Sequence, residues 1–125
     1  MALTKKAEHV PIDVNLMRHC QDGIGRDGWL GYLNDSTGKI AGYTESYPTD
    51  FIFYVPSHRY EIYVPNTGFY AGKLYCYGSQ KEFIAFVKFN VGNPEIVKNI
   101  PENAKYIRFV TGIDDWDLSY FKRIF

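Results

Sequence analysis

The residues in this chain that could bind a ligand are aromatic side chains in the turns between its apolar segments. A pyranose ring has an apolar face that stacks on an aromatic ring, and its hydroxyl groups need polar side chains nearby. We therefore predict a carbohydrate-binding surface formed by Trp29, Tyr43, Tyr47, Asn66, Tyr70, Asp115 and Trp116. The alternatives are loop aromatics without a function and a protein interface, since surface tyrosine and tryptophan also mark interfaces.

Three aspartates stand close together in the segment "GIDDWD". A hard cation such as Ca²⁺ binds several oxygens from one loop, and Asp114, Asp115 and Asp117 could supply three of them. Their spacing matches no calcium-loop motif, so a solvated acidic turn is the favoured interpretation. We predict no metal site and no cofactor.

A convergent set of catalytic groups is not evident in the sequence. His9 and His19 lie in the N-terminal region, His58 lies in a turn, and no two histidines have metal-ligand spacing. No serine has the context of a nucleophile elbow. His19 and Cys20 are adjacent, which is poor geometry for a shared zinc ion. We therefore expect a binding or structural protein and not an enzyme.

Composition limits the partners and favours strands. Lys+Arg 14 balance Asp+Glu 14 without a basic cluster, which argues against a nucleic-acid partner. No apolar run reaches the length of a membrane span, and the first residues lack the apolar core of a signal peptide, so we expect a protein folded in a cytoplasm. Aromatic residues make up 18% of the chain and pack well in strands. Cys20 and Cys76 do not suggest a disulfide framework, and Cys76 is predicted to be buried.

The pattern divides the 125 residues into an arm and a domain. Residues 1–27 are predicted to form an extended N-terminal arm for attachment or oligomerisation, with a short helix considered at 14–20; a first strand plus disordered residues is the alternative. Residues 28–125 contain short apolar segments separated by turns such as "DSTGK" and "SHR". About seven to nine strands at this spacing indicate an all-β sandwich or barrel.

The segment "NIPENAKYIRFV" predicts a turn followed by a strand. Pro101 fixes φ and has no N–H to donate, so it suits the entrance of a strand. Tyr106 and Arg108 then share one face, and Ile107 and Phe109 share the face that we expect in the core. Arg108 is either solvated or a buried guanidinium satisfied by carbonyls and a carboxylate, and the rarity of buried arginine favours the solvated state.

Three segments carry a resemblance to a known family. The matching residues are Ile52, Tyr54, Pro56 and Tyr60 in one hairpin, Cys76, Tyr77, Lys81, Phe83 and Ile84 in a second, and Pro101, Asn103, Ala104, Lys105, Tyr106, Ile107 and Arg108 in the strand described above. Together they resemble the jelly-roll modules of bacteriophage virion proteins, which are related to carbohydrate-binding modules. Ser57 and Gly78 depart from the pattern, which prefers glycine and aspartate there, and both lie in turns.

The resemblance implies an antiparallel jelly-roll β-sandwich. It also implies a structural protein of the phage particle, synthesised in the host cytoplasm and displayed on the head or tail as a fibre, baseplate or decoration subunit. Such a subunit would contact other virion proteins through its arm, form a homo-oligomer such as a trimer, and bind host-surface polysaccharide. A dedicated receptor-binding module without an assembly role is the alternative, and a bacterial carbohydrate-binding module is a third.

Overall fold

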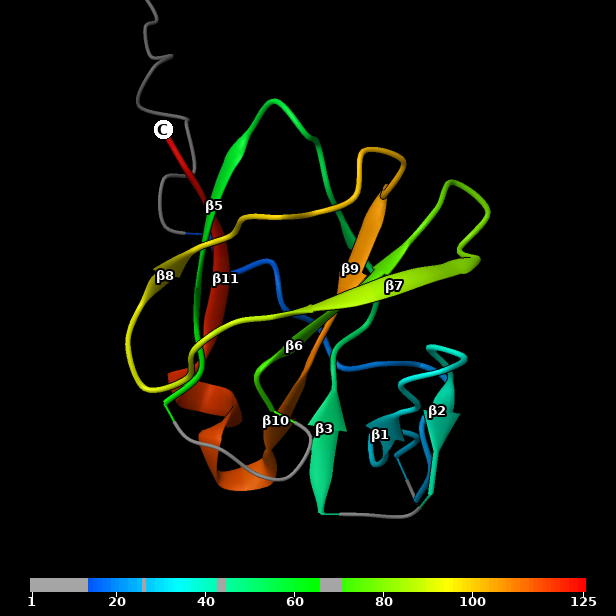
Figure 1. The fold of residues 1–125 in the computed structure, drawn as a ribbon. Coiled ribbons are helices and arrows are strands. Elements are labelled where there is room, and N and C mark those ends of the chain that lie inside the picture. Colours follow the sequence, from blue (N-terminus) through cyan, green and yellow to red (C-terminus); the bar gives the residue numbers. More distant parts are fainter. Residues whose placement is uncertain (1–13, 26, 43–44, 66–70) are drawn as a thin grey trace, which may run out of the picture.

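The computed structural model describes residues 14–25, 27–42, 45–65 and 71–125. The regular structure of these residues consists of short strands and one 3₁₀ helix, η2 (Ile113–Leu118) (Figure 1). The predicted all-β class is therefore confirmed. Within the described ranges, no helix is both long and apolar enough to cross a membrane.

The described residues contain eleven strands, which pair antiparallel in four small sheets. The strands are β1 (Tyr32–Leu33), β2 (Ile40–Ala41), β3 (Ser46–Pro48), β4 (Ile52–Phe53), β5 (Arg59–Tyr63), β6 (Lys73–Tyr77), β7 (Phe83–Lys88), β8 (Glu95–Ile96), β9 (Tyr106–Arg108), β10 (Val110–Gly112) and β11 (Tyr120–Ile124). The largest sheet has the order β4-β9-β6-β7, the next has the order β11-β5-β8, and the two pairs are β1-β2 and β10-β3.

Some extended runs change partners part-way along, which divides them into more strands than the sequence suggests. Residues 106–112 pair with β4 and β6 as β9, and then with β3 as β10. The change occurs at Phe109, whose N–H donates to Oγ1 of Thr49 (3.1 Å) and whose carbonyl accepts the N–H of Thr49 (2.8 Å). The buried Thr49 therefore holds the chain where it passes from one sheet to the other.

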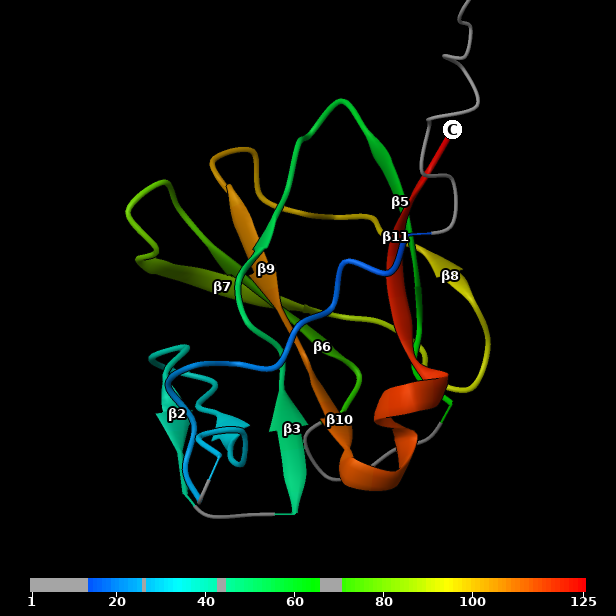
Figure 2. The same ribbon diagram turned by 180° about the vertical axis from the view of Figure 1, so that it is seen from behind.

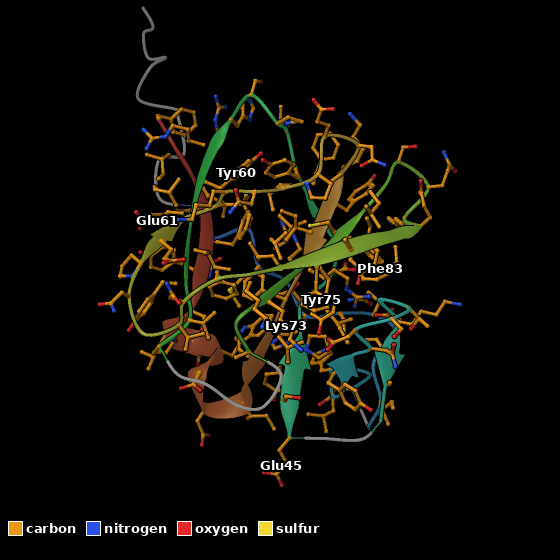
Figure 3. The ribbon with its side chains drawn as sticks, in the orientation of Figure 1. Glu45, Tyr60, Glu61, Lys73, Tyr75 and Phe83 are labelled. Carbon is orange, nitrogen blue, oxygen red and sulfur yellow. The ribbon has the colours of Figure 1, made fainter. Side chains whose placement is uncertain are left out.

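The main hydrophobic core lies between the four-stranded and the three-stranded sheets. Ile62 of β5 and Phe121 of β11 meet Leu74 of β6 and Ile107 of β9 there, and all four side chains are buried. Side chains fill the space between the two sheets, among them Tyr60 of β5 (Figure 3). The two sheets thus face each other across a shared apolar core.

The turn and strand after Pro101 have the predicted arrangement. The N–H of Ala104 donates to the carbonyl of Pro101 (3.1 Å), which closes the turn. Ile107 and Phe109 then lie in the main core, as expected. Tyr106 packs on the opposite face of the sheet, against a second apolar cluster.

This second cluster covers the outer face of the four-stranded sheet. Its buried members are Leu33, Tyr75, Tyr77 and Val110. Because successive residues of a strand point to opposite faces, β6 sends Leu74 into the main core and both tyrosines into the second cluster. β6 is therefore buried on both faces, with the β1–β2 hairpin lying over its outer face.

A bulge between β6 and β7 brings two phenylalanines to the second cluster. Tyr75 pairs with Phe86, but Tyr77 pairs with Phe83, because the register shifts between Cys76 and Tyr77. The extra residue on β7 lets Phe83 and Phe86 pack on the same face. Cys76 is fully buried, as predicted, and burial raises the pKa of its thiol to about 12.

Polar side chains of β6 fasten the β1–β2 hairpin onto the sheet. The hydroxyl of Tyr77 donates to the carbonyl of Gly38 (2.5 Å), and the hydroxyl of Tyr75 donates to Oδ1 of Asp35 (2.6 Å). Nζ of Lys73 forms an ion pair with Oδ2 of Asp35 (2.7 Å). Burial, together with the bond to Asp35, holds the pKa of Tyr75 well above its usual value. The hairpin position therefore depends on three directed interactions as well as on packing.

The described part of the N-terminal segment packs against the body. Residues 14–25 run across its back, behind β9 and β6 in Figure 1 and in front of them in Figure 2. Backbone hydrogen bonds join this segment to β11 and to the residue that follows Thr49, and Met17 and Cys20 are buried. The short helix considered around Met17 is not formed, because these residues are extended along the sheets. The predicted role of residues 1–27 as an attachment arm stays a prediction, and its first thirteen residues lie outside the described part.

We expect Gly38→Ala to lower the free energy of unfolding by about 2–4 kcal/mol. Gly38 has a φ of 65°, and a Cβ atom there would lie 2.3 Å from Cδ1 of Phe83. Gly92→Ala is the matched control, because Gly92 also has a positive φ (95°) but its Cβ would meet nothing nearer than the carbonyl oxygen of Pro65 at 3.8 Å. Urea denaturation measures both variants. Equal losses would contradict the close packing of the hairpin on Phe83.

Candidate functional site

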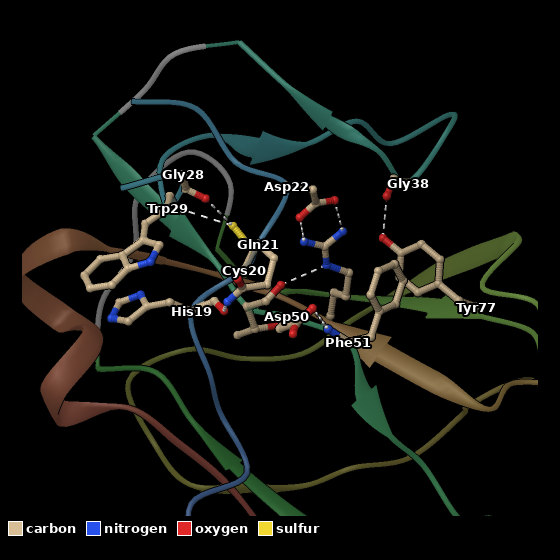
Figure 4. A network of polar contacts seen from close by, with 12 residues as sticks. His19, Cys20, Gln21, Asp22, Gly28, Trp29, Gly38, Asp50, Phe51 and Tyr77 are labelled. Atoms are coloured by element: carbon tan, nitrogen blue, oxygen red, sulfur yellow. Dashed lines mark hydrogen bonds and ion pairs between the residues drawn. The ribbon is translucent and has the colours of Figure 1, made fainter. Parts of the chain in front are cut away.

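Arg108 is a buried charge at the centre of a polar network. Only 1% of its surface is exposed. Nε donates to the carbonyl of Thr49 (2.8 Å), and the two terminal nitrogens donate to Oδ1 (2.8 Å) and Oδ2 (3.1 Å) of Asp22 (Figure 4). The favoured prediction of a solvated Arg108 is therefore wrong, and the buried alternative is correct.

The Asp22–Arg108 pair connects the interior to the surface. The side chain of Asp22 is 52% exposed, whereas that of Arg108 is 1% exposed. Cζ of Arg108 lies 4.4 Å from the ring centroid of Phe51, within the range of a cation–π interaction. A two-pronged carboxylate–guanidinium pair has a fixed geometry. Asp22 therefore presents carboxylate oxygens to solvent in a defined orientation.

This pair lines a pocket of about 600 Å³, which is a typical size for a small-molecule site. The other lining residues are Thr37, Gly38, Lys39 and Ile40 of the hairpin, Phe51 just before β4, Tyr77 and Phe83 of the sheet, and Lys81 and Glu82 of the β6–β7 turn. Because the hydroxyl of Tyr77 is bonded to the carbonyl of Gly38, the aromatic wall and the hairpin turn are fixed relative to each other. The pocket combines apolar rings with charged groups.

The β6–β7 turn at the pocket rim has an unusual backbone. Lys81 adopts a φ of 62°, a region that residues other than glycine rarely occupy. Its Nζ lies 5.0 Å from the ring centroid of Phe51. Glu82 folds over its own turn, where Oε1 accepts the N–H of Gln80 (2.9 Å). A Cβ atom on Gly78 would lie 2.2 Å from Oε2 of Glu82, so this carboxylate position requires the glycine that departs from the family pattern.

Three of the rings predicted to bind carbohydrate come together around His19. The imidazole stacks between Trp29 (3.8 Å between ring centroids) and Trp116 (4.0 Å). Tyr47 packs edge-on against the imidazole at 4.9 Å. No sequence pattern links His19 to these rings. We call the four residues the His19 cluster.

The His19 cluster uses ring faces that a sugar would otherwise contact. Trp29 and Trp116 each stack one face on the imidazole, so only their outer faces remain for a ligand. Asp115 is half-buried beside this cluster, and its backbone carbonyl accepts the hydroxyl of Ser119 (2.7 Å). Tyr43, Asn66 and Tyr70 lie outside the described residues. Carbohydrate binding at this surface stays a prediction.

One nitrogen of the His19 imidazole lacks a hydrogen-bond partner among the described residues. This nitrogen, Nδ1, is buried. Burial lowers the pKa of His19 below its usual value, while the negative charge of Asp117 opposes this effect. Packing between the two indoles therefore disfavours the charged form of His19.

The acidic turn forms the start of η2. Asp114 and Asp117 are exposed and Asp115 is half-buried. Among the described residues, no three histidine, cysteine, aspartate or glutamate side chains gather in a way that could hold a metal ion. The predicted absence of a cofactor stays a prediction.

None of the residues that line the pocket was predicted as a site residue. The alternation in "KYIRF" did place Arg108 on the face opposite the main core, which is the face that carries the pocket. Asp22 is 86 residues away from Arg108 in the sequence, and Thr49 is 59 residues away. No local pattern could therefore identify either of them as a partner.

Comparison with known proteins identifies no relative. No family model matches the chain, and no curated protein or solved structure matches it either. The likeness to phage modules therefore depends on the motifs described above.

We expect Asp22→Ala to lower the free energy of unfolding by about 2–3 kcal/mol, because it leaves the buried guanidinium of Arg108 without its carboxylate. The loss should stay below that of a fully buried pair, since the exposed position of Asp22 lets water replace part of the carboxylate. Glu102→Ala, in an exposed turn, is the control and should change stability by less than about 0.5 kcal/mol. Urea denaturation that gives the same small loss for both would refute the structural role of the pair.

We expect the His19 cluster to make stability depend on pH. Because the pKa of His19 is lower in the folded protein, unfolding takes up protons when the pH is below the unfolded pKa of 6.5. The contribution of neutral His19 is complete above that pKa and decreases as the pH falls below it. His19→Phe keeps a ring between the indoles but cannot titrate. Urea denaturation at about pH 7.5 and pH 5 should show a larger loss for the wild type than for the variant. Identical losses would contradict the prediction.

Proposed function

We propose that this chain is a carbohydrate-binding module of a bacteriophage virion that binds a saccharide in the Asp22–Arg108 pocket. The observation that carries the proposal is the pocket itself, where a fixed carboxylate–guanidinium pair lies beside aromatic rings. Sugar hydroxyls can donate to the exposed oxygens of Asp22, and the apolar face of the sugar can contact Phe83 and Ile40. The proposed role is binding without catalysis.

The family resemblance supports the same site. Tyr77, Lys81, Phe83 and Arg108 all belong to the matching motifs, and all four line the pocket. The two facing sheets are compatible with an antiparallel jelly-roll β-sandwich, which is the fold that we propose. On this view the protein is made in the host cytoplasm and displayed on the virion surface as a homo-oligomer such as a trimer. The N-terminal arm, residues 1–27, would attach it to other virion proteins.

A second candidate function is assembly without glycan binding. A mainly apolar groove of about 440 Å³ lies where residues 14–16 join the body. Phe53 and Phe125 line this groove and are 60% and 63% exposed. Large exposed apolar side chains beside a groove favour a protein contact. This surface suits a structural subunit that packs against a neighbouring virion protein.

We expect a glycan array probed with the labelled wild-type protein to give a signal, and Thr37→Trp to reduce it at least about tenfold by filling the rim of the pocket. Thr37 is exposed, so the indole should not disturb the core. Lys98→Trp places the same ring at an exposed position outside the pocket and should bind like the wild type.

Other outcomes of this experiment separate the candidates. An array without any signal from the wild type would reject the proposal and favour the assembly function. A signal that survives Thr37→Trp but is lost in Trp116→Phe would move the binding site to the His19 cluster.

A further inference from the structure

We propose that the saccharide bound in the pocket is acidic, and that its carboxylate or phosphate group is held by Lys39 and Lys81. This inference rests on the proposed function. It assigns the class of ligand from the balance of charges around the pocket.

The positive and negative charges of the groups that line the pocket do not balance. Asp22 and Arg108 neutralise each other through two hydrogen bonds. Glu82 is directed onto the backbone of its own turn, where it accepts the N–H of Gln80. Lys39 and Lys81 have no carboxylate partner within ion-pair distance among the described residues. The pocket therefore has an excess of positive charge and two ammonium groups available to a ligand.

The two lysines come from separate turns that meet at the pocket. Lys39 belongs to the β1–β2 turn, which the hydroxyl of Tyr77 holds through the carbonyl of Gly38. Lys81 belongs to the β6–β7 turn. Both lysines therefore line the same pocket, although they come from different turns.

Lys81 is also positioned more tightly than an ordinary surface lysine. Its Nζ lies 5.0 Å from the ring centroid of Phe51 and 5.4 Å from that of Tyr106. Its φ of 62° lies in a region that residues other than glycine rarely occupy. Backbone strain of this kind is concentrated at functional sites. The ammonium group of Lys81 thus lies beside Phe51, which lines the pocket.

The ammonium groups of Lys39 and Lys81 would bind an acidic group of the ligand more strongly than a neutral hydroxyl. Hydrogen bonds between an ammonium group and an anion are about twice as strong as neutral ones. Since both lysines lie at the rim, their attraction is also screened by salt. The affinity for an acidic saccharide should therefore fall as ionic strength rises, whereas the affinity for a neutral one should change little.

The test uses the full chain on an array that pairs neutral glycans with their uronate and phosphate counterparts. We expect the acidic members to bind at least about tenfold more tightly than the neutral members, and the stronger of the two acidic arms identifies the anion. Lys39→Gln and Lys81→Gln should each remove most of this preference for acidic glycans. Lys98→Gln, outside the pocket, is the control.

The possible failures are distinguishable. If neutral and acidic glycans bind equally and the lysine variants behave like the wild type, the acidic class is wrong and the proposed binding function stands. If no glycan of either kind binds, the proposed function fails and this inference fails with it. Unchanged thermal unfolding of the two lysine variants excludes a loss of fold as the cause of a lost preference.

Discussion

A guanidinium group removed from water needs hydrogen-bond acceptors, and the architecture of this protein follows from how Arg108 obtains them. Thr49 supplies a carbonyl at the point where one sheet gives way to another. Asp22 supplies a carboxylate from the N-terminal segment. Its two hydrogen bonds to Arg108 hold that segment against the sheet. Because a buried charge without partners would cost several kcal/mol, these contacts constrain two distant parts of the chain at once.

The position of the β1–β2 hairpin over the four-stranded sheet also follows from the need of buried polar atoms for hydrogen-bond partners. β6 is buried on both faces, so its polar atoms must also find partners within the protein. Tyr75 and Tyr77 do so by bonding to the β1–β2 hairpin. These directed bonds fix the hairpin at a defined height above the sheet. The space left between the hairpin, the β6–β7 turn and the Asp22–Arg108 pair is the pocket.

The two aromatic regions of the molecule differ in what they leave available to a ligand. In the His19 cluster the indole faces stack on the protein's own imidazole. In the pocket the rings stand beside an exposed carboxylate and two lysines without carboxylate partners among the described residues. Recognition of a saccharide needs both an apolar face and directed polar groups, and the pocket offers both in one place. The apolar groove beside Val14 is a separate surface, suited to a protein contact.

The sequence by itself determined the all-β class, the turn after Pro101 and the face that each residue from Tyr106 to Phe109 occupies, because alternation and turn chemistry are local properties. It also placed Cys76 in the interior. Tertiary structure alone decided the burial of Arg108 and the stacking of His19. The physical reason is that both depend on partners brought together by sheet pairing, and the 86 residues between Asp22 and Arg108 carry no local sign of their contact.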